Sequence, residues 1–253
     1  MLKTRIMPCL LVSDGRLVKT VKFKNPAYVG DPVNAIKIYN EKEVDELILL
    51  DITATLEGRK PNVAFLSEVV NECFMPLAYG GGVRDLDDIK RIFGLGIEKV
   101  AINSYAVENP AFIEKAATIF GSQSIMLSLD VKKNLFGKYG VYTQGGRKGT
   151  SDDPVAWAVE AERRGAGEVL LNSIDQDGTM EGYDIKLIKK VTDAVHIPVI
   201  ACGGAGKLHD FKAAVAEGGA SAVAAGSMVV YQGKNKGVLI NFPSRADLKN
   251  ILD

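Results

Sequence analysis

The stretch MPLAYGGGVRDLDDIKRIFGLGIEKVAINS (residues 75–104) decides the fold, because the chain repeats it as IPVIACGGAGKLHDFKAAVAEGGASAVAAGS (197–227). The alignment superposes the proline, the glycine run and the helix-like segment of the two copies at one constant separation. The same separation relates DELILLD (45–51) to GEVLLNS (167–173). Chance does not maintain one separation through two strands, a glycine turn and a helix. We therefore predict two similar halves joined near residue 121.

Short apolar runs alternate with longer amphipathic stretches along the chain, which is typical of repeated βα units around a parallel sheet. Eight evenly spaced strands in 253 residues indicate an α/β protein, a (βα)8 TIM barrel made of two fused half-barrels. We expect one domain spanning residues 1–253; an open doubly wound sheet is the alternative. The predicted strands are IMPCLLV (6–12), ELILLDI (46–52), PLAYG (76–80), KVAIN (99–103), SIMLSLD (124–130), EVLLNSI (168–174), PVIACG (198–203) and SAVAAG (221–226).

The predicted helices open near Asp or Asn residues, whose side chains accept hydrogen bonds from the free N–H groups of a first turn. Several also have proline in that turn, where its missing N–H costs nothing. The clearest helical segments are Asp31 to Asn40, Asn62 to Cys73, Asp85 to Leu95, Asp152 to Arg164 and, as a weak final helix, Arg245 to Leu252.

The composition excludes several classes of protein. Lys+Arg and Asp+Glu both number 31, so the chain has no net positive field with which to attract nucleic acid or an anionic membrane. No apolar run approaches the ~18 residues of a membrane span. Three separated cysteines (Cys9, Cys73, Cys202) and two histidines (His196, His209) form no metal-site pattern. We predict a cytoplasmic protein with no metal and no cofactor.

Glycine and small polar residues follow the predicted strands at the end where TIM barrels place their functional loops. Glycine allows a ligand to approach the backbone, and the N–H groups of a following helix attract anions. Because the pattern occurs in both halves, we predict two phosphate sites on opposite sides of the barrel mouth; glycines that only make tight turns are the alternative. The predicted phosphate-binding residues are Gly82, Asn103, Ser104, Asp177, Gly178, Gly204, Gly226 and Ser227.

Three carboxylates end predicted strands, where a tuned pKa would allow general acid or base chemistry. We expect Asp130 to be catalytic, whereas ordering of a loop is at least as good an explanation for Asp51. Asp177 is the third. The segment 15–30, which carries Lys19, is interpreted either as a mobile substrate loop or as a partner surface.

The strings that carry a family resemblance are DGRLVK (14–19), GDPV (30–33), DELILLDITA (45–54), GGGV (80–83), EKVAIN (98–103), VENP (107–110), FGSQ (120–123), RGAGEVLLNSIDQDGT (164–179) and ACGGAGK (201–207). With these strings the chain resembles, over nearly its whole length, the cyclase subunit, HisF, of imidazole glycerol phosphate synthase. In that family a glutaminase docks on the N-terminal face of the barrel, and its ammonia travels through the barrel to a ribulosyl substrate on the opposite face.

The resemblance assigns roles to residues at the N-terminal face. A ring of four charged residues forms the family's proposed ammonia gate, and Glu98 and Gln123 fall at its glutaminase interface. A glutaminase subunit and a phosphorylated small molecule are the partners it implies. The ring residues are Arg5, Glu46, Lys99 and Glu168.

One position departs from the family. The family uses an aspartate at the end of the first strand together with one matching Asp130, but the run CLLV (9–12) has Leu11 at the first position. Leucine cannot transfer a proton. The runs PCLL (8–11) and YNEKEVDELILLDI (39–52) are similar to a paralogous group that occurs with surface-polysaccharide genes. That group is thought to work with a glutaminase and an N-acetyl-sugar amidotransferase to make an acetamidino group.

Three functions therefore remain open. The first is a barrel that channels ammonia for acetamidino-sugar formation, supported by Leu11 and the complete charged ring. The second is a genuine imidazole glycerol phosphate synthase cyclase of histidine biosynthesis, supported by Asp130 and both phosphate sites. The third is a non-catalytic activator of the glutaminase that binds a phosphorylated ligand and needs no tunnel. Whether this chain is itself an enzyme stays open.

Overall fold

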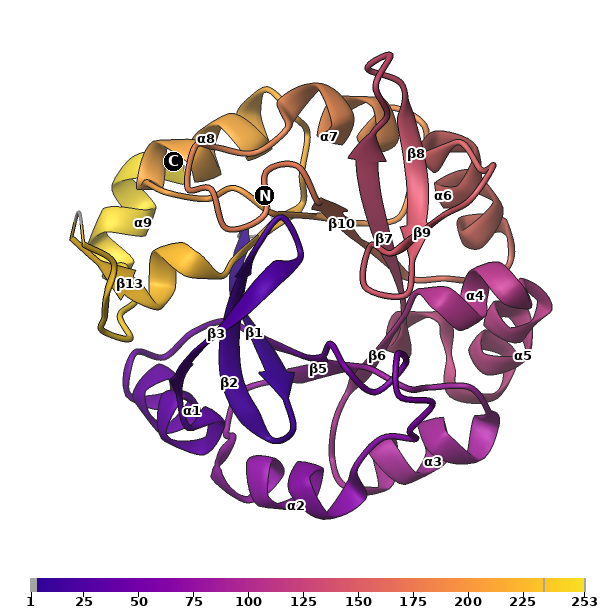
Figure 1. Ribbon diagram of the computed structural model, residues 1–253, viewed down its shortest axis with the longest axis horizontal. Coiled ribbons are helices and arrows are strands. Elements are labelled where there is room, and N and C mark those ends of the chain that lie inside the picture. Colours follow the sequence, from indigo (N-terminus) through magenta and orange to yellow (C-terminus); the bar gives the residue numbers. More distant parts are fainter. Residues whose placement is uncertain (1–3, 234, 253) are drawn as a thin grey trace.

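Eight parallel strands close into a barrel surrounded by helices (Figure 1). The computed structural model describes residues 4–233 and 235–252. Each strand pairs with the next in chain order, and β12 pairs back onto β1, so the ring has no open edge. This confirms the predicted (βα)8 barrel and its eight strands. The barrel strands are β1 (Arg5–Ser13), β4 (Leu47–Asp51), β5 (Leu77–Gly80), β6 (Lys99–Ile102), β7 (Ile125–Lys133), β10 (Glu168–Ser173), β11 (Val199–Cys202) and β12 (Ala222–Ala225).

The predicted helix starts agree with the observed caps, with one correction. Asp31 accepts a hydrogen bond from the Asn34 N–H at 2.8 Å, and Asn62 and Asp85 cap in the same way. The fourth helix begins after Asp153, not Asp152. The helices are α1 (Pro32–Glu41), α2 (Val63–Glu72), α3 (Leu86–Gly94), α4 (Ser104–Glu108), α5 (Ala111–Phe120), α6 (Pro154–Arg163), α7 (Ile185–Thr192), α8 (Leu208–Ala216) and α9 (Arg245–Leu252), with short 3-10 turns η1 (Ser122–Ser124) and η2 (Ser227–Val229).

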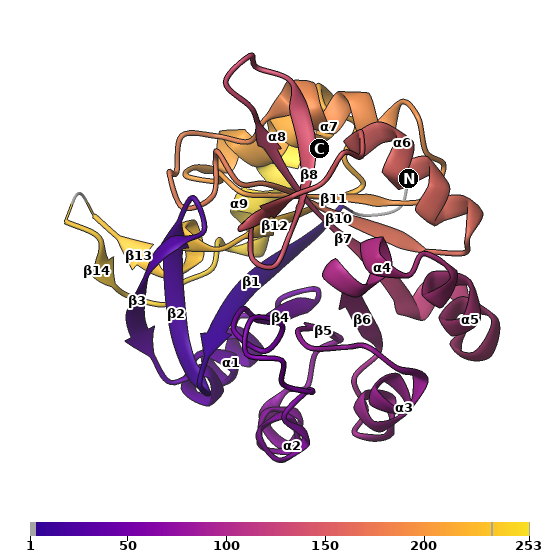
Figure 2. The same cartoon turned by 45° about the vertical axis from the view of Figure 1, so that its right-hand side comes forward.

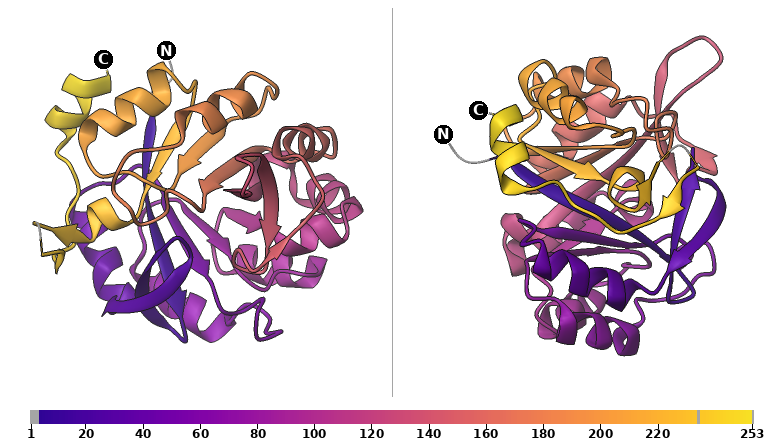
Figure 3. Two further views of the ribbon diagram at one scale, coloured as in Figure 1. Left: turned by 45° about the horizontal axis from the view of Figure 1, so that its top comes forward. Right: turned by 90° about the vertical axis from the view of Figure 1, so that its left-hand side faces the viewer.

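Antiparallel hairpins extend the barrel. The segment 15–30, interpreted from the sequence as a loop, is a hairpin of β2 (Arg16–Val21) and β3 (Lys24–Gly30). A second hairpin continues β7 through β8 (Tyr139–Thr143) to β9 (Lys148–Gly149). Both stand at the same end of the barrel (Figure 3, right). A small third hairpin, β13 (Tyr231–Gln232) with β14 (Gly237–Val238), lies on the outside (Figure 2).

Alternation along the strands divides the buried residues into two clusters. Even-numbered residues of β1, such as Leu10, pack outward against the helices. The odd-numbered Met7 and Cys9 pack inside the barrel with residues of the other strands, including Met126 and Leu170. Successive side chains of a strand point to opposite faces, so this division follows directly from the strand period of two. In the described residues, no helix is long and apolar enough to cross a membrane.

Gly167 lies directly before β10 and packs against η1, and a substitution there tests this packing. A side-chain methyl at this position would collide with the backbone carbonyl of Ser122. We expect Gly167→Ala to lower the free energy of unfolding by about 1–3 kcal/mol, as overpacked sites do. Gly94 ends α3 and has open space around it, so Gly94→Ala should leave stability unchanged or raise it by up to about 1 kcal/mol. Equal urea denaturation midpoints for both variants would contradict this account.

Candidate functional site

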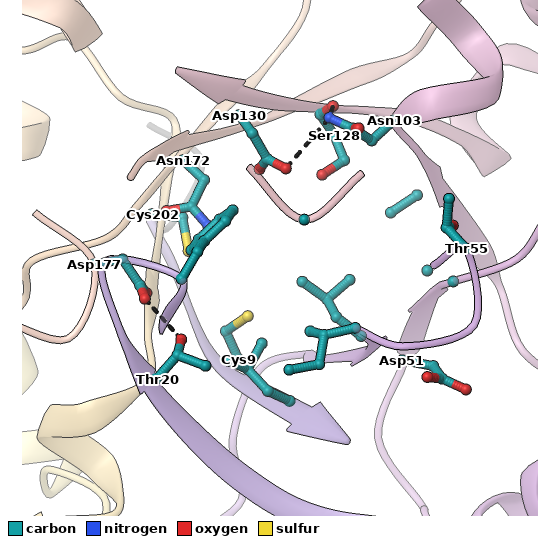
Figure 4. A pocket seen from close by; sticks show the side chains of 18 of the residues that line it. Cys9, Thr20, Asp51, Thr55, Asn103, Ser128, Asp130, Asn172, Asp177 and Cys202 are labelled. Carbon is teal, nitrogen blue, oxygen red and sulfur yellow. Dashed lines mark hydrogen bonds between the residues drawn. The ribbon is translucent and has the colours of Figure 1, made fainter. Parts of the chain in front are cut away.

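A large cavity opens at the C-terminal ends of the barrel strands, with a volume of about 560 Å³ (Figure 4). Asp130 lines it, and so does Lys19. The structure therefore brings together residues from both halves of the sequence, one predicted at a strand end and one predicted in a loop. All of the predicted phosphate-binding residues lie on the cavity wall: Gly82, Asn103, Ser104, Asp177, Gly178, Gly204, Gly226 and Ser227.

In the first half, the polar side chains of the predicted phosphate site hold the cavity wall together. Asn103 Nδ2 donates to the carbonyls of Ser128 (3.0 Å) and Tyr142 (3.2 Å). Ser104 Oγ donates to Asn103 Oδ1 and accepts the Gln144 N–H. These bonds tie β6 to the β7–β8 hairpin and fix the shape of the mouth.

In the second half, the glycines allow close approach between loops of the chain itself. A methyl group at Gly178 would collide with the Thr20 carbonyl, and one at Gly204 with the Gly182 carbonyl. The β2–β3 hairpin is held here, because Thr20 Oγ1 donates to Asp177 Oδ2 at 2.9 Å. Tight packing thus accounts for these glycines, while a phosphate role for both halves stays a prediction.

Asp130 lies on β7 where this strand pairs with both β10 and β8, and the residue is only 8% exposed. Burial, together with repulsion from the Asp177 carboxylate, raises the pKa of Asp130 to about 7. Asn103 Nδ2 approaches it at 3.3 Å. The group is therefore poised to take up or release a proton near neutral pH, which suits a general acid or base.

Lys19 differs from the mobile loop residue that the sequence suggested. It belongs to β2, is buried, and its ammonium group donates to the carbonyl of Cys9 at 2.7 Å. Burial lowers the pKa of Lys19, and the nearby Asp177 carboxylate opposes that effect. A buried ammonium group at the wall of the cavity provides one positive charge for an anionic ligand.

Asp51 has a structural role in this conformation. Its carboxylate accepts hydrogen bonds from the N–H groups of Thr53 and Ala54 and pairs with Arg59 at 3.2 Å. These contacts order the loop after β4, and the carboxyl group lies at the edge of the view in Figure 4, far from the Asp130 side chain. Loop ordering was one of the two explanations open from the sequence.

Leu11 lines the cavity floor on β1, where its register partner on β4 is Leu50, which also lines the cavity. Asp14, three residues further along, is exposed in the β1–β2 turn. The cavity floor is accordingly apolar at Leu11 and Leu50, while the Lys19 ammonium group lies beside the Cys9 carbonyl of the same strand β1.

The opposite end of the barrel carries the four charged residues of the ring. Arg5 pairs with Glu46 and with Glu168 at 2.6 Å each, and Lys99 lies 2.9 Å from each of the same two carboxylates. Every charge therefore has two neighbours of opposite sign, and the ring closes. Both glutamates are buried, whereas Arg5 and Lys99 are partly exposed at the N-terminal face.

A layer of buried apolar side chains lies between the charged ring and the cavity. Its larger members are Met7, Ile48, Met126, Leu170 and Ile200, all fully buried. Ala78 is also buried in this layer.

The two residues assigned to a glutaminase interface lie at the N-terminal face. Glu98 immediately precedes β6, and Gln123 lies in η1 before β7; both are exposed. Sequence reasoning missed Phe23 and Arg147, which also line the cavity. The run YTQGGRKG (142–149), rich in glycine and flanked by basic residues, was the available signal for the second of these.

Comparison with known proteins agrees with this architecture. The family described as "Histidine biosynthesis protein" matches residues 5–236. The protein named "Putative imidazole glycerol phosphate synthase subunit hisF2" of Pseudomonas aeruginosa is 49% identical over 243 residues, covering 96% of this chain and 97% of its own. A protein of Leptospira interrogans named "Putative imidazole glycerol phosphate synthase subunit HisF" is 48% identical, covering 98% of each chain. The "Imidazole glycerol phosphate synthase subunit HisF" of Hyphomonas neptunium is 50% identical, covering 90% of each.

The fold and the cavity at its C-terminal face thus define a TIM-barrel protein of the histidine biosynthesis class. Within that class, the chain belongs to the HisF family of imidazole glycerol phosphate synthase subunits.

The raised pKa of Asp130 makes the free energy of unfolding depend on pH. The folded chain binds a proton at this carboxyl more tightly than the unfolded chain, so stability falls as pH rises from about 4 to 7. Asp130→Asn removes the buried charge. We expect the variant to gain roughly 2–4 kcal/mol over the wild type at pH 8, and less at pH 5.

Urea denaturation of both proteins at pH 5 and pH 8 measures this difference. Asp153→Asn, which changes a carboxylate at the exposed start of α6, is the control for a general charge effect. A gain for Asp130→Asn that stays constant between the two pH values would rule out a carboxyl titrating near neutrality.

Proposed function

We propose that this chain is a HisF-like barrel that receives ammonia from a glutaminase and delivers it for acetamidino formation on a sugar of a surface polysaccharide. The observation that carries the proposal is the contrast between the two ends of the barrel. The charged ring at the N-terminal face is complete, while Leu11 stands at the cavity floor where the family has a second acid–base aspartate. Delivery of ammonia needs the complete ring, and cyclisation needs the aspartate that Leu11 replaces.

The closed ring supports a gate at the entrance. Arg5 and Lys99 each join both glutamates, so displacing the Lys99 ammonium leaves a continuous chain of charges through Arg5. A lysine side chain has a flexible four-carbon stem and a compact ammonium group. Arginine instead holds its partners through a rigid planar guanidinium group, whose hydrogen bonds would break together if it moved. Lys99 is therefore the member of the ring that opens.

The apolar layer supports the passage of ammonia rather than ammonium. Fully buried groups such as Met7, Met126 and Leu170 disfavour an ion, because an isolated charge in that environment lacks compensating partners. Methionine side chains are unbranched and adaptable, so they yield to a small neutral molecule at moderate cost. Beyond this layer, the passage reaches the floor of the cavity beside Asp130.

The partners follow from the proposal. A glutaminase subunit docks at the N-terminal face over Glu98 and Gln123, and an N-acetyl-sugar amidotransferase meets the cavity mouth. Asp130 accepts or releases a proton as ammonia arrives. The phosphate sites at the mouth hold a phosphorylated ligand, with the Lys19 ammonium supplying positive charge.

A genuine cyclase is the second candidate, because Asp130 keeps a pKa near neutrality and the cavity is open. It requires a proton carrier other than Leu11. Activation of the glutaminase by a bound phosphorylated ligand, without ammonia transfer, is the third candidate; it requires the ring only as structure.

Replacing Lys99 tests ammonia transfer. A complex of glutaminase, amidotransferase and the Lys99→Met barrel should still hydrolyse glutamine but form little amidine, because ammonia escapes at the disrupted ring. Added ammonium should restore amidine formation. The exposed Lys212→Met on α8 is the matched control and should keep glutamine hydrolysis coupled to product. Unchanged coupling in Lys99→Met would favour the activator.

An ammonia-dependent cyclase assay with the ribulosyl substrate separates the first two candidates, since high ammonium bypasses the glutaminase. The wild-type chain should turn over ~10²–10⁴-fold more slowly than the Hyphomonas neptunium HisF protein, as expected when one member of an acid–base pair is missing. Leu11→Asp tests whether this one position limits the reaction. Comparable turnover of the two wild-type proteins would establish a cyclase and remove the case for the sugar pathway.

A further inference from the structure

The floor of the cavity has two walls of opposite character. In the closed order β1, β4, β5, β6, β7, β10, β11, β12, strands β1 and β4 stand diametrically across the barrel from β7 and β10. Leu11 of β1 and Asp130 of β7 both line the cavity, so these side chains face each other across its floor. The same relation places Leu50 of β4 opposite Asn172 of β10.

The apolar wall consists of Leu11 and Leu50. These two residues are register partners on adjacent strands, so their side chains form one continuous surface. Both are only partly buried, pack against the inner cluster and line the cavity with the rest of their surface. Cys9 lies one layer deeper on β1, where its carbonyl accepts a hydrogen bond from the Lys19 ammonium group. The two leucine side chains offer contacts to an apolar group and no hydrogen bond.

The polar wall consists of Ser128, Asp130 and Asn172. Asp130 and Asn172 are register partners, and all three side chains are nine-tenths or more buried while lining the cavity. Asn172 Oδ1 has no hydrogen-bond partner among the described residues. Figure 4 shows Asp130 and Ser128 across the cavity from Cys9. A carboxyl, a hydroxyl and an amide together offer both donors and acceptors.

A ligand that satisfies both walls carries an apolar end and atoms that donate and accept hydrogen bonds. A bare ammonium ion leaves the apolar wall without a partner, and an alkyl chain leaves the polar wall unsatisfied. An acetamide or acetamidine group has a methyl on one side of its central carbon and polar atoms on the other. The cavity volume of about 560 Å³ accommodates a monosaccharide that carries such a group.

We infer that the cavity floor is a subsite for the N-acetyl or acetamidino group of a sugar phosphate, with the methyl on the apolar wall and the polar atoms on the polar wall. This subsite rests on the proposed function, since it places the acceptor's amide carbon where ammonia enters the cavity. It also gives Leu11 a positive role: the side chain that abolishes acid–base chemistry at this position supplies half of the methyl contact.

Three sugar phosphates that differ at one group test the subsite. The probes are N-acetylglucosamine 1-phosphate, N-formylglucosamine 1-phosphate and glucosamine 1-phosphate, titrated into the purified full-length chain by calorimetry or NMR. The formyl compound keeps the amide and lacks only the methyl. We expect the acetyl compound to bind at least about 4-fold more tightly than the formyl compound, the value of one buried methyl group.

Variants of the apolar wall locate the preference. Leu11→Asn and Leu50→Asn should each abolish the acetyl-over-formyl preference; asparagine is close in size and adds no charge to repel the phosphate. Leu56 also lines the cavity but lies in the loop after β4, so Leu56→Asn is the matched control and should retain the preference. Melting temperatures confirm that each variant is folded.

The outcomes distinguish the subsite from the proposed function. Equal affinity for the acetyl and formyl compounds, or a preference that survives in both wall variants, would overturn the subsite. Absence of binding by all three compounds would overturn it as well. If Lys99→Met still uncouples glutamine hydrolysis in either case, ammonia delivery stands and the acceptor reacts outside the barrel.

Discussion

The strand period of two is the constraint on which this structure depends. Eight parallel strands close with matched registers, so every second side chain enters the barrel and falls into a layer. From the N-terminal to the C-terminal face these layers are the charged ring, the apolar layer and the cavity floor with its apolar and polar walls. A shift of one residue in any strand would send its inward residues to the helices, placing Glu46 or Glu168 in the outer core. The pairing register of the strands therefore determines the positions of the ring, the apolar layer and the site together.

The charged layer is tolerable because it is closed. Taking an ion out of water costs several kcal/mol unless its partners are well placed. Here the two buried glutamates each lie between two cations, while Arg5 and Lys99 retain partial contact with solvent. Replacing such a network with apolar residues often stabilises a protein, so stability alone does not explain its presence. The gate that we propose for ammonia accounts for the charges at this end of the barrel, because the next layer of the interior is apolar.

The internal repeat predicted the barrel strands because both copies carry the same alternation of short apolar runs and amphipathic stretches. The hairpins were not predicted, although β2 (Arg16–Val21) and β8 (Tyr139–Thr143) lie at nearly the same separation as the rest of the repeat, because their strands are short and their pairing is antiparallel and local. Lys19 was therefore expected in a loop, whereas it belongs to β2 and donates to the Cys9 carbonyl. The polar contacts of Asn103 depend on the β7–β8 hairpin, which lies beside β6 only in the folded chain.

Leu11 shows how one substitution changes a site without changing its scaffold. An aspartate at this position would face Asp130, whose pKa burial and Asp177 already raise to about 7, and the added negative charge would oppose ionisation of that carboxyl further. Leucine removes this repulsion and leaves Asp130 as the acidic group facing the apolar wall. At these two facing positions the site then has one proton carrier and one apolar surface instead of two proton carriers, while the Asp177 carboxyl also lines the cavity. This arrangement supports our proposal that a methyl-bearing group lies between Leu11 and the Asp130 carboxyl, in preference to a cyclisation that uses both family aspartates.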